Sequence, residues 1–156
     1  MDKKIEEFLN TEQMYADIIN INIPIKPTSW QSTRFAMNNN GKMYAYQPKK
    51  IKDYKDSIVF YTKKCLENHK LKCNIPTTNK VKINVCFIFN KKIKDIEYKT
   101  TKPDLADNLM KPLMDALNAF IWVDDSQIIE IESRKINMQC ENDEGYIILQ
   151  VKILND

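Results

Sequence analysis

Several residue types that mark common functional sites are scarce in this 156-residue sequence. It contains a single histidine, His69, which argues against a zinc site and gives little support to a Ser/His/Asp triad. Its four cysteines form no CxxC pair, so we expect reduced structural thiols at Cys65, Cys73, Cys86 and Cys140. The chemistry of the protein is therefore expected to depend on other side chains.

Long apolar stretches and flexible linkers are also missing. Glycine occurs only at Gly41 and Gly145, and no Gly/Ser linker, internal repeat or low-complexity tract divides the chain. No run approaches about 18 apolar residues, so we expect no membrane span. The first ten residues, MDKKIEEFLN, lack the apolar core of a signal peptide, so we expect an intracellular protein. With 43% hydrophobic and 29% charged residues, the sequence is typical of one globular domain.

Arginine is rare among the 24 basic residues, because all except Arg34 and Arg134 are lysines. The net charge is only +3, but lysines gather locally at 49–52, 63–64 and 91–94. Such clusters can attract a phosphate backbone through the release of counterions. A solvated surface is the alternative interpretation of each cluster, so the lysines alone do not identify a nucleic-acid-binding protein.

Hydrophobic periodicity predicts an α+β fold. Residues 1–15 are predicted to form a short amphipathic helix, which is an N-terminal appendage to a domain at 16–156. The predicted elements of that domain are a strand at 18–25, a hairpin at 34–37 and 43–46 around the turn NNNG, a helix at 48–70, a strand at 81–89, a helix at 107–120, and strands at 127–136 and 146–154. This order predicts a single domain with one mixed β-sheet and helices packed on one face of it.

Acidic residues are concentrated between positions 102 and 134. Four of them form two clusters that flank the helix predicted at 107–120, Asp104 with Asp107 and Asp124 with Asp125. On that helix Asp107 and Lys111 are one turn apart, so their side chains can converge on one site. Clustered carboxylates repel one another unless a cation lies between them, and Mg²⁺ prefers such oxygen ligands while keeping several waters. The pattern therefore indicates a magnesium site that acts on phosphate.

Simpler roles are available for the same residues. Asp107 or Asn108 could cap the predicted helix, because both are favoured N-cap residues. The sequence Asp124-Asp125-Ser126 could form only the turn between helix and strand. The presence of two clusters with Lys111 in register favours the catalytic interpretation.

The stretch KPDLADNLMKPLMDALNAFIWVDDSQIIEI resembles the signature of RusA-type Holliday junction resolvases, a family of small endonucleases common in phages and prophages. The family pattern is K/R-x-D-x-D-N-x-x-K at the start of a helix, then D-A-L, an aromatic residue, D-D, a small residue and Q-[IV]. The matching positions are Asp107, Asn108, Lys111, Asp115, Ala116, Leu117, Trp122, Asp124, Asp125, Gln127 and Ile128. More weakly, INIPIKPTSWQSTR is similar to the family's opening strand and proline-containing loop, while residues 1–15 lie outside the resemblance.

The resemblance implies a RusA-like, dimeric fold and an Mg²⁺-dependent endonuclease, with Mn²⁺ as a possible substitute. Such an enzyme resolves four-way DNA junctions by phosphodiester hydrolysis in DNA recombination and repair. We expect a homodimer that acts on branched DNA, away from membranes, in the cytoplasm of a bacterial or phage-infected cell.

The resemblance also assigns roles to individual residues. The implied metal ligands and catalytic carboxylates are Asp104, Asp107 and Asp125, with Lys111 as the catalytic lysine. The residues expected to support them are Asp124, Gln127 and Asn108. The expected contacts to DNA phosphates come from Arg34, Lys49, Lys50, Lys91, Lys92 and Lys94.

This chain departs from the family pattern at one point. The family usually has D-x-D, whereas Leu105 and Ala106 both lie between Asp104 and Asp107 here. In addition, Pro112 removes one hydrogen bond from the helix that follows. We therefore predict that the start of this helix is shifted or bulged.

Two other functions compete with the nuclease. One is a non-catalytic protein that binds branched DNA on the same scaffold, with its acidic site degraded by the extra residue. The other is an interaction module in which the aspartates only cap helices and form turns. The first predicts junction binding without metal-dependent cutting, and the second predicts no DNA binding at physiological salt.

Overall fold

A five-stranded mixed β-sheet forms the body of the protein in the computed structural model, which describes residues 3–30 and 33–155. Its strands lie in the order β1-β7-β4-β6-β5. Their bounds are β1 Tyr15–Ile23, β7 Gly145–Leu154, β4 Val81–Asn90, β6 Ile128–Met138 and β5 Glu97–Tyr98. Strands β4 and β6 are parallel and all other neighbours are antiparallel, so the predicted mixed sheet is confirmed.

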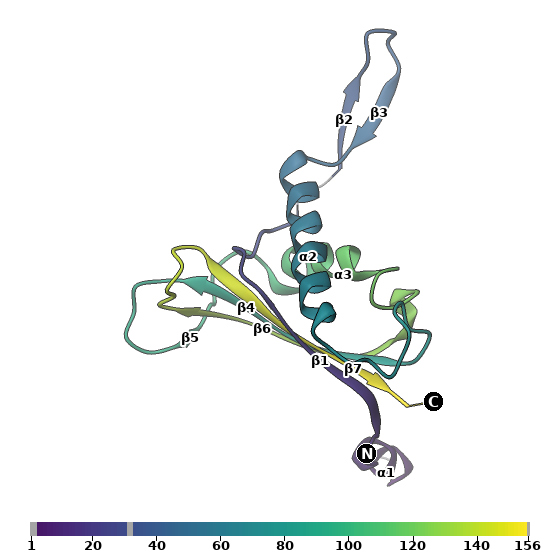
Figure 1. Ribbon diagram of the computed structural model, residues 1–156. Helices are drawn as coiled ribbons and strands as arrows, with labels where there is room; N and C mark the ends of the chain where they lie inside the picture. The colour runs from purple at the N-terminus through teal and green to yellow at the C-terminus, as the bar shows by residue number, and fades with distance from the viewer. Residues whose placement is uncertain (1–2, 31–32, 156) are drawn as a thin grey trace.

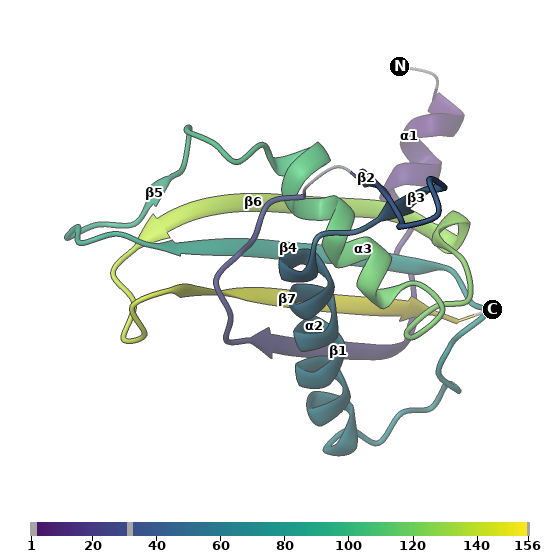
Figure 2. The same cartoon turned by 90° about the horizontal axis from the view of Figure 1, so that it is seen from above.

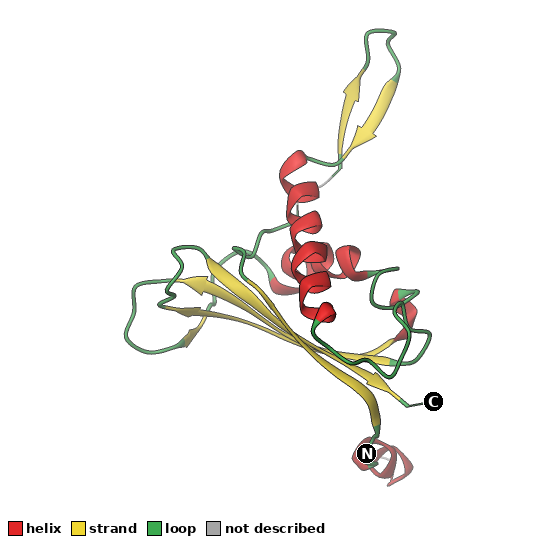
Figure 3. Cartoon of the chain, viewed as in Figure 1, coloured by secondary structure: helices red, strands yellow, loops and turns green. Residues whose placement is uncertain are grey.

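Two helices, α2 (Lys49–Glu67) and α3 (Lys111–Leu117), cover one face of this sheet (Figures 1 and 3). One side of α2 is buried at Ile51, Tyr54 and Ile58. Alternate residues of β1, β4 and β7 face these helices, and the core contains Ile19, Ile21, Ile23, Val81, Ile83, Val85, Phe87, Ile147, Leu149, Val151 and Ile153. The predicted arrangement of helices on one face of the sheet is therefore also confirmed.

The opposite face of the sheet carries polar groups and exposed aliphatic side chains. Lys82 on β4 pairs with Glu130 on β6, with 2.5 Å between Nζ and Oε2. Ile18 on β1 and Ile148 on β7 are nearly half exposed. The first helix, α1 (Lys3–Asn10), lies past the N-terminal end of β1 in Figure 1 and buries no residue. It is shorter than the predicted 1–15 helix, since it ends at Asn10 and Tyr15 already belongs to β1.

The predicted hairpin forms between β2 (Arg34–Met37) and β3 (Met43–Tyr46). Its turn is closed by the side chain of Asn38, whose Oδ1 accepts from the backbone N–H groups of Asn40 and Lys42, and Gly41 takes a positive φ of 74°. The hairpin projects past the start of α2 and away from the sheet, as Figure 1 shows.

The helix predicted at 107–120 ends early. Residue 118 is extended and Ala119 has a φ of 60°, so the α-helix stops at Leu117. The following segment bonds to Thr77 instead: the N–H of Thr77 donates to the carbonyl of Ile121 (2.8 Å) and the N–H of Val123 donates to the carbonyl of Thr77 (3.2 Å). Ile121 and Trp122 extend the apolar pattern of the predicted helix because both side chains are buried. They lie outside the helix, which ends at Leu117.

The short edge strand β5 was not predicted, because only two residues pair with β6 and both side chains are exposed. None of the helices in residues 3–30 and 33–155 is long and apolar enough to cross a membrane.

Candidate active site

The acidic segment begins with a turn of π-helix, η1 (Leu105–Met110), directly before α3. Asp104 precedes the turn in an extended conformation, and its carbonyl accepts from the N–H of Leu109 at 3.2 Å, five residues along the chain. Such a turn holds one residue more than an α-helical turn, which matches the extra residue between Asp104 and Asp107. The predicted bulge at the helix start is confirmed.

Buried apolar residues fix the orientation of this segment. Leu109, Leu113 and Leu117 are fully buried in the core. The side chains of Asp107 and Lys111 consequently face solvent. Asp104 is exposed as well, so the turn presents two carboxylates and an ammonium group on the surface.

Pro112 leaves a carbonyl without its usual helical partner. In an α-helix, the carbonyl of Asn108 would accept from the N–H of residue 112, and proline has none. The backbone N–H of Trp30 donates to this carbonyl instead, at 2.7 Å. The loop after β1 is thereby attached to the start of the acidic helix.

The indole ring of Trp30 lies next to two lysines from different helices. The ring centroid is 4.6 Å from Nζ of Lys111 and 5.6 Å from Nζ of Lys55, within the range of cation–π interactions. Lys55 also approaches Asp115, with 3.9 Å between Nζ and Oδ2. Sequence reasoning missed both Trp30 and Lys55, and the one available signal was the carbonyl left unpaired by Pro112.

The loop that precedes Asp104 is held by Lys135 on β6. Its Nζ donates to the carbonyl oxygens of Thr101 and Pro103, both at 2.7 Å. Since charge-assisted hydrogen bonds are stronger than neutral ones, this ammonium group fixes the backbone immediately before Asp104. Lys135 was also missed, because nothing in its strand pattern distinguishes it from a surface lysine.

The second acidic cluster forms a capped turn. Asp124 precedes the short 3₁₀-helix η2 (Asp125–Gln127), and its Oδ1 accepts from the N–H of Ser126 at 2.8 Å. Hydrogen bonding from Ser126, first from its side chain and then from its backbone N–H, lowers the pKa of Asp124. Gln127 completes a capping box, because its Oε1 accepts from the N–H of Asp124 at 2.8 Å. Its Nε2 donates to the carbonyls of Thr77 and Asn79. Asp124 and Gln127 therefore shape the turn beside Asp125.

Asp125 is oriented by a buried tryptophan. Its Oδ1 accepts from Nε1 of Trp122 at 2.7 Å, and Trp122 is fully buried. This contact fixes a carboxylate that is otherwise exposed at the start of β6.

The two acidic clusters lie on either side of α3 along the chain. Asp104 and Asp107 lie before α3, whereas Asp125 lies past its other end, next to the start of β6 (Figure 2). In the part of the chain that the structure describes, no three His, Cys, Asp or Glu side chains are grouped so that they could hold a metal ion. Asp104 and Asp107 alone still fit Mg²⁺, which proteins often bind through one or two carboxylates together with waters and substrate phosphates.

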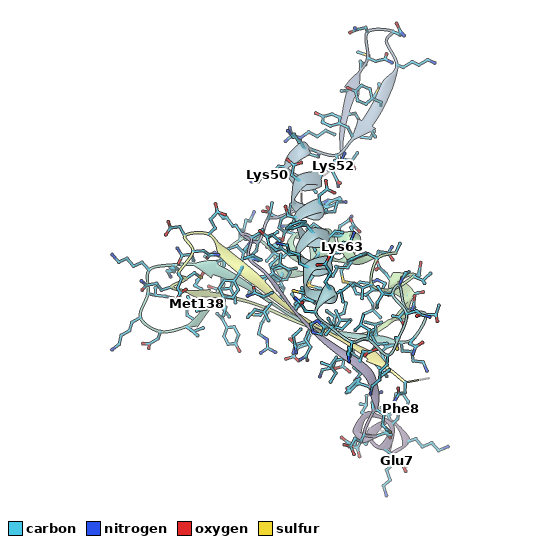
Figure 4. All side chains as sticks on the ribbon, viewed as in Figure 1. Glu7, Phe8, Lys50, Lys52, Lys63 and Met138 are labelled. Carbon is cyan, nitrogen blue, oxygen red and sulfur yellow. The ribbon has the colours of Figure 1, made fainter. Side chains whose placement is uncertain are left out.

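The lysines and arginine expected to contact DNA fall into two places. Arg34, which pairs with Tyr46 at the base of the hairpin, and Lys49 and Lys50 at the start of α2 are all exposed, and Figure 4 labels Lys50 below the hairpin. The loop at 91–94 lies at an end of the sheet away from the hairpin in both Figure 1 and Figure 2. There Lys91 is paired with Glu97 (2.5 Å), while Lys92 and Lys94 are exposed.

Comparison with known proteins adds two findings. The profile of the family described as Endodeoxyribonuclease RusA matches residues 24–145, which include the loop with Trp30, the acidic segment and four strands of the sheet in whole or in part. The protein named crossover junction endodeoxyribonuclease rusA from Lactococcus phage r1t is 35% identical over 107 residues, which cover 58% of this chain and 78% of the phage protein.

Proposed function

The chain belongs to the RusA family of endodeoxyribonucleases, and we propose that it resolves four-way DNA junctions by Mg²⁺-dependent phosphodiester hydrolysis. The observation that carries this proposal is the surface formed by Asp104, Asp107 and Lys111 at the η1 turn. It combines ligands for a hard cation with a positive charge, and both suit a phosphate substrate.

Asp104 and Asp107 are the proposed metal ligands. A bound Mg²⁺, or Mn²⁺ in its place, supplies positive charge to the phosphoryl oxygens and lowers the pKa of water. Asp104 and Asp107 would hold the metal ion at the η1 turn. Lys135 keeps the backbone before Asp104 in place by donating to the carbonyls of Thr101 and Pro103.

Lys111 is the proposed catalytic lysine. Negative charge develops on the phosphoryl group and on the leaving oxygen during hydrolysis, and an ammonium group placed there in advance stabilises it. Lys111 starts α3 one turn after Asp107, so it lies on the metal-binding side of the segment.

Asp125 was assigned to the metal site by the acidic pattern and by the resemblance, and in the described residues it forms no group of three potential ligands with Asp104 and Asp107. We therefore assign no step to it. An Asp125→Asn protein that still cuts junctions at the wild-type rate would remove this residue from the proposed ligand set.

DNA binding is proposed to involve Arg34, Lys49 and Lys50, with Lys91, Lys92 and Lys94 at the other end of the sheet. A homodimer with two equivalent active sites suits a four-way junction, which has approximate two-fold symmetry. The proposed setting is recombination and repair in the cytoplasm of a bacterial or phage-infected cell, since the similar protein comes from a phage.

Cleavage of a synthetic four-way junction tests the proposal. The wild type should cut the junction but not a linear duplex, and it should cut with Mg²⁺ but not with EDTA. Asp107→Asn should reduce cutting to the level seen with EDTA, because it removes a proposed ligand charge. The matched control is Asp56→Asn, which changes an exposed aspartate on α2 and should cut normally.

One observation favours a second function. Because the described residues contain no group of three potential metal ligands, the same scaffold could bind branched DNA without cutting it. If wild type and Asp107→Asn both bind the junction and neither cuts, this binding function replaces the nuclease. If neither protein binds DNA at physiological salt, both proposals fail.

A further inference from the structure

The ammonium group of Lys111 is held by an aromatic ring and not by an anion. Among residues 3–30 and 33–155, no carboxylate lies within 4.0 Å of its Nζ, and the contact that the structure gives it is the ring of Trp30 at 4.6 Å. We infer that Trp30 is the positioning residue of Lys111: it fixes the ammonium group at the active site without neutralising its charge. This inference rests on the proposed function.

The type of contact explains why a ring suits this position. A carboxylate partner would restrain Lys111, but it would also cancel the charge that the phosphate needs. The face of an indole attracts a cation through its quadrupole and carries no net charge. Lys111 is thus restrained and still fully available to an anionic substrate.

Lys55 shows the contrast on the same ring. Nζ of Lys55 lies 5.6 Å from the centroid of the Trp30 ring. It also lies 3.9 Å from Oδ2 of Asp115, and this carboxylate offsets the charge of Lys55. Of the two lysines beside the indole, Lys111 alone lacks a carboxylate neighbour within 4.0 Å in the described chain. The Trp30 ring therefore contacts one lysine that is close to a carboxylate, Lys55, and one that is not, Lys111.

The backbone fixes where the ring lies. The N–H of Trp30 donates to the carbonyl of Asn108, three residues before Lys111, and this carbonyl is available because Pro112 has no N–H. The ring and the lysine are thus placed by one hydrogen bond at the start of the catalytic helix. A side-chain substitution at position 30 removes the ring and keeps this N–H.

Substitutions of Trp30 test the inference. Trp30→Leu keeps an apolar side chain but lacks a π face, whereas Trp30→Phe keeps a π face. In single-turnover cleavage with saturating junction and Mg²⁺, Trp30→Leu should slow cutting by about 3- to 30-fold, the range expected for loss of one cation–π contact. The junction Kd should stay unchanged, and Trp30→Phe should recover most of the rate.

A double substitution separates positioning from general damage. If Trp30 acts through Lys111, then Trp30→Leu should cause no further loss in a Lys111→Ala protein. A further loss of the same size in that background would overturn the inference. So would a weaker junction Kd with an unchanged cutting rate, because Trp30 would then be a DNA contact.

A measurement without DNA tests the placement itself. The ε-methylene protons of Lys111 should be shifted upfield by the indole ring current in the wild type and in Lys55→Met, and the shift should vanish in Trp30→Leu. An unshifted signal in the folded wild type would overturn the inference whether or not the protein cuts DNA. If the wild type cuts, Lys111→Ala cuts measurably but much more slowly, and Trp30→Leu cuts normally, the inference fails and the proposed function stands.

Discussion

Single polar side chains decide much of the local structure of this protein. Asp17 on β1 is buried and accepts the backbone N–H groups of Lys72 and Cys73, which lie in the segment that follows α2. The sequence predicts the strand that contains Asp17 from its alternating residues. It does not predict these bonds, because their donors are backbone groups of an irregular segment 55 and 56 positions away.

Replacement of Asp17 should destabilise the fold in a pH-dependent way. Burial alone would raise the pKa of this carboxyl, but the N–H groups of Lys72 and Cys73 outweigh it and lower the pKa. The stabilisation is therefore present above the ordinary pKa of about 3.9 and is lost as the pH falls through the lower pKa of the folded state.

We expect Asp17→Asn to lower the free energy of unfolding by about 1–3 kcal/mol at neutral pH, since an amide cannot accept all of these hydrogen bonds. Urea unfolding of the wild type and of Asp17→Asn, at neutral pH and at a pH below the folded-state pKa, measures the difference between their free energies of unfolding. This difference should be smaller in acid. A constant difference at both pH values would contradict this account, and the exposed Asp56→Asn is the control.

At the scale of elements, the start of the acidic helix was the most predictable irregular feature. The extra residue between Asp104 and Asp107, together with Pro112, predicted a bulge, and the structure has a π-turn there. The end of the same helix was not predictable from local pattern, because Thr77 provides the competing backbone bonds at 121–123. The acidic pattern and the resemblance together assigned Asp104, Asp107, Lys111 and Asp125 to the site, and this assignment stays a prediction.

The loop before η1 should be sensitive to Lys135. Lys135→Met removes the donor to the carbonyls of Thr101 and Pro103, so Asp104 should be held less firmly. We expect the Mg²⁺ concentration for half-maximal cutting to rise by about tenfold, as for other residues that support metal ligands. Lys135→Arg should recover part of the loss, and Lys82→Met on the opposite face of the sheet is the control. An unchanged Mg²⁺ dependence in Lys135→Met would show that the loop is held by other contacts.

At the scale of the whole molecule, the hairpin β2–β3 and the start of α2 extend the protein away from its sheet (Figure 1). A two-stranded ribbon with little support is only marginally stable alone, and here Phe35, Met37 and Met43 are about 70% exposed. Arg34, Lys49 and Lys50 give this projection a positive charge. Its shape could be predicted only in part, because the sequence predicted the hairpin but not its direction.

Removing these charges should weaken DNA binding in a salt-dependent way. The triple variant Arg34→Gln, Lys49→Gln, Lys50→Gln should bind junctions more weakly and reduce the slope of log Kd against log salt by about three, one for each lost phosphate contact. Lys63→Gln, which changes an exposed lysine farther along α2 that Figure 4 labels, is the control for loss of a single charge elsewhere on the helix and should change the slope by less than one. An unchanged slope in the triple variant would place the DNA elsewhere on the surface.

The order of strands in the sheet also bears on synthesis of the protein. Strand β7, which follows the other four strands of the sheet along the chain, fills the position between β1 and β4, so these two earlier strands have no shared neighbour until residues 145–154 are made. The acidic segment precedes β7 and packs against a core to which Ile147, Leu149, Val151 and Ile153 contribute. A nascent or prematurely terminated chain therefore carries all the proposed catalytic residues without the support that orders them.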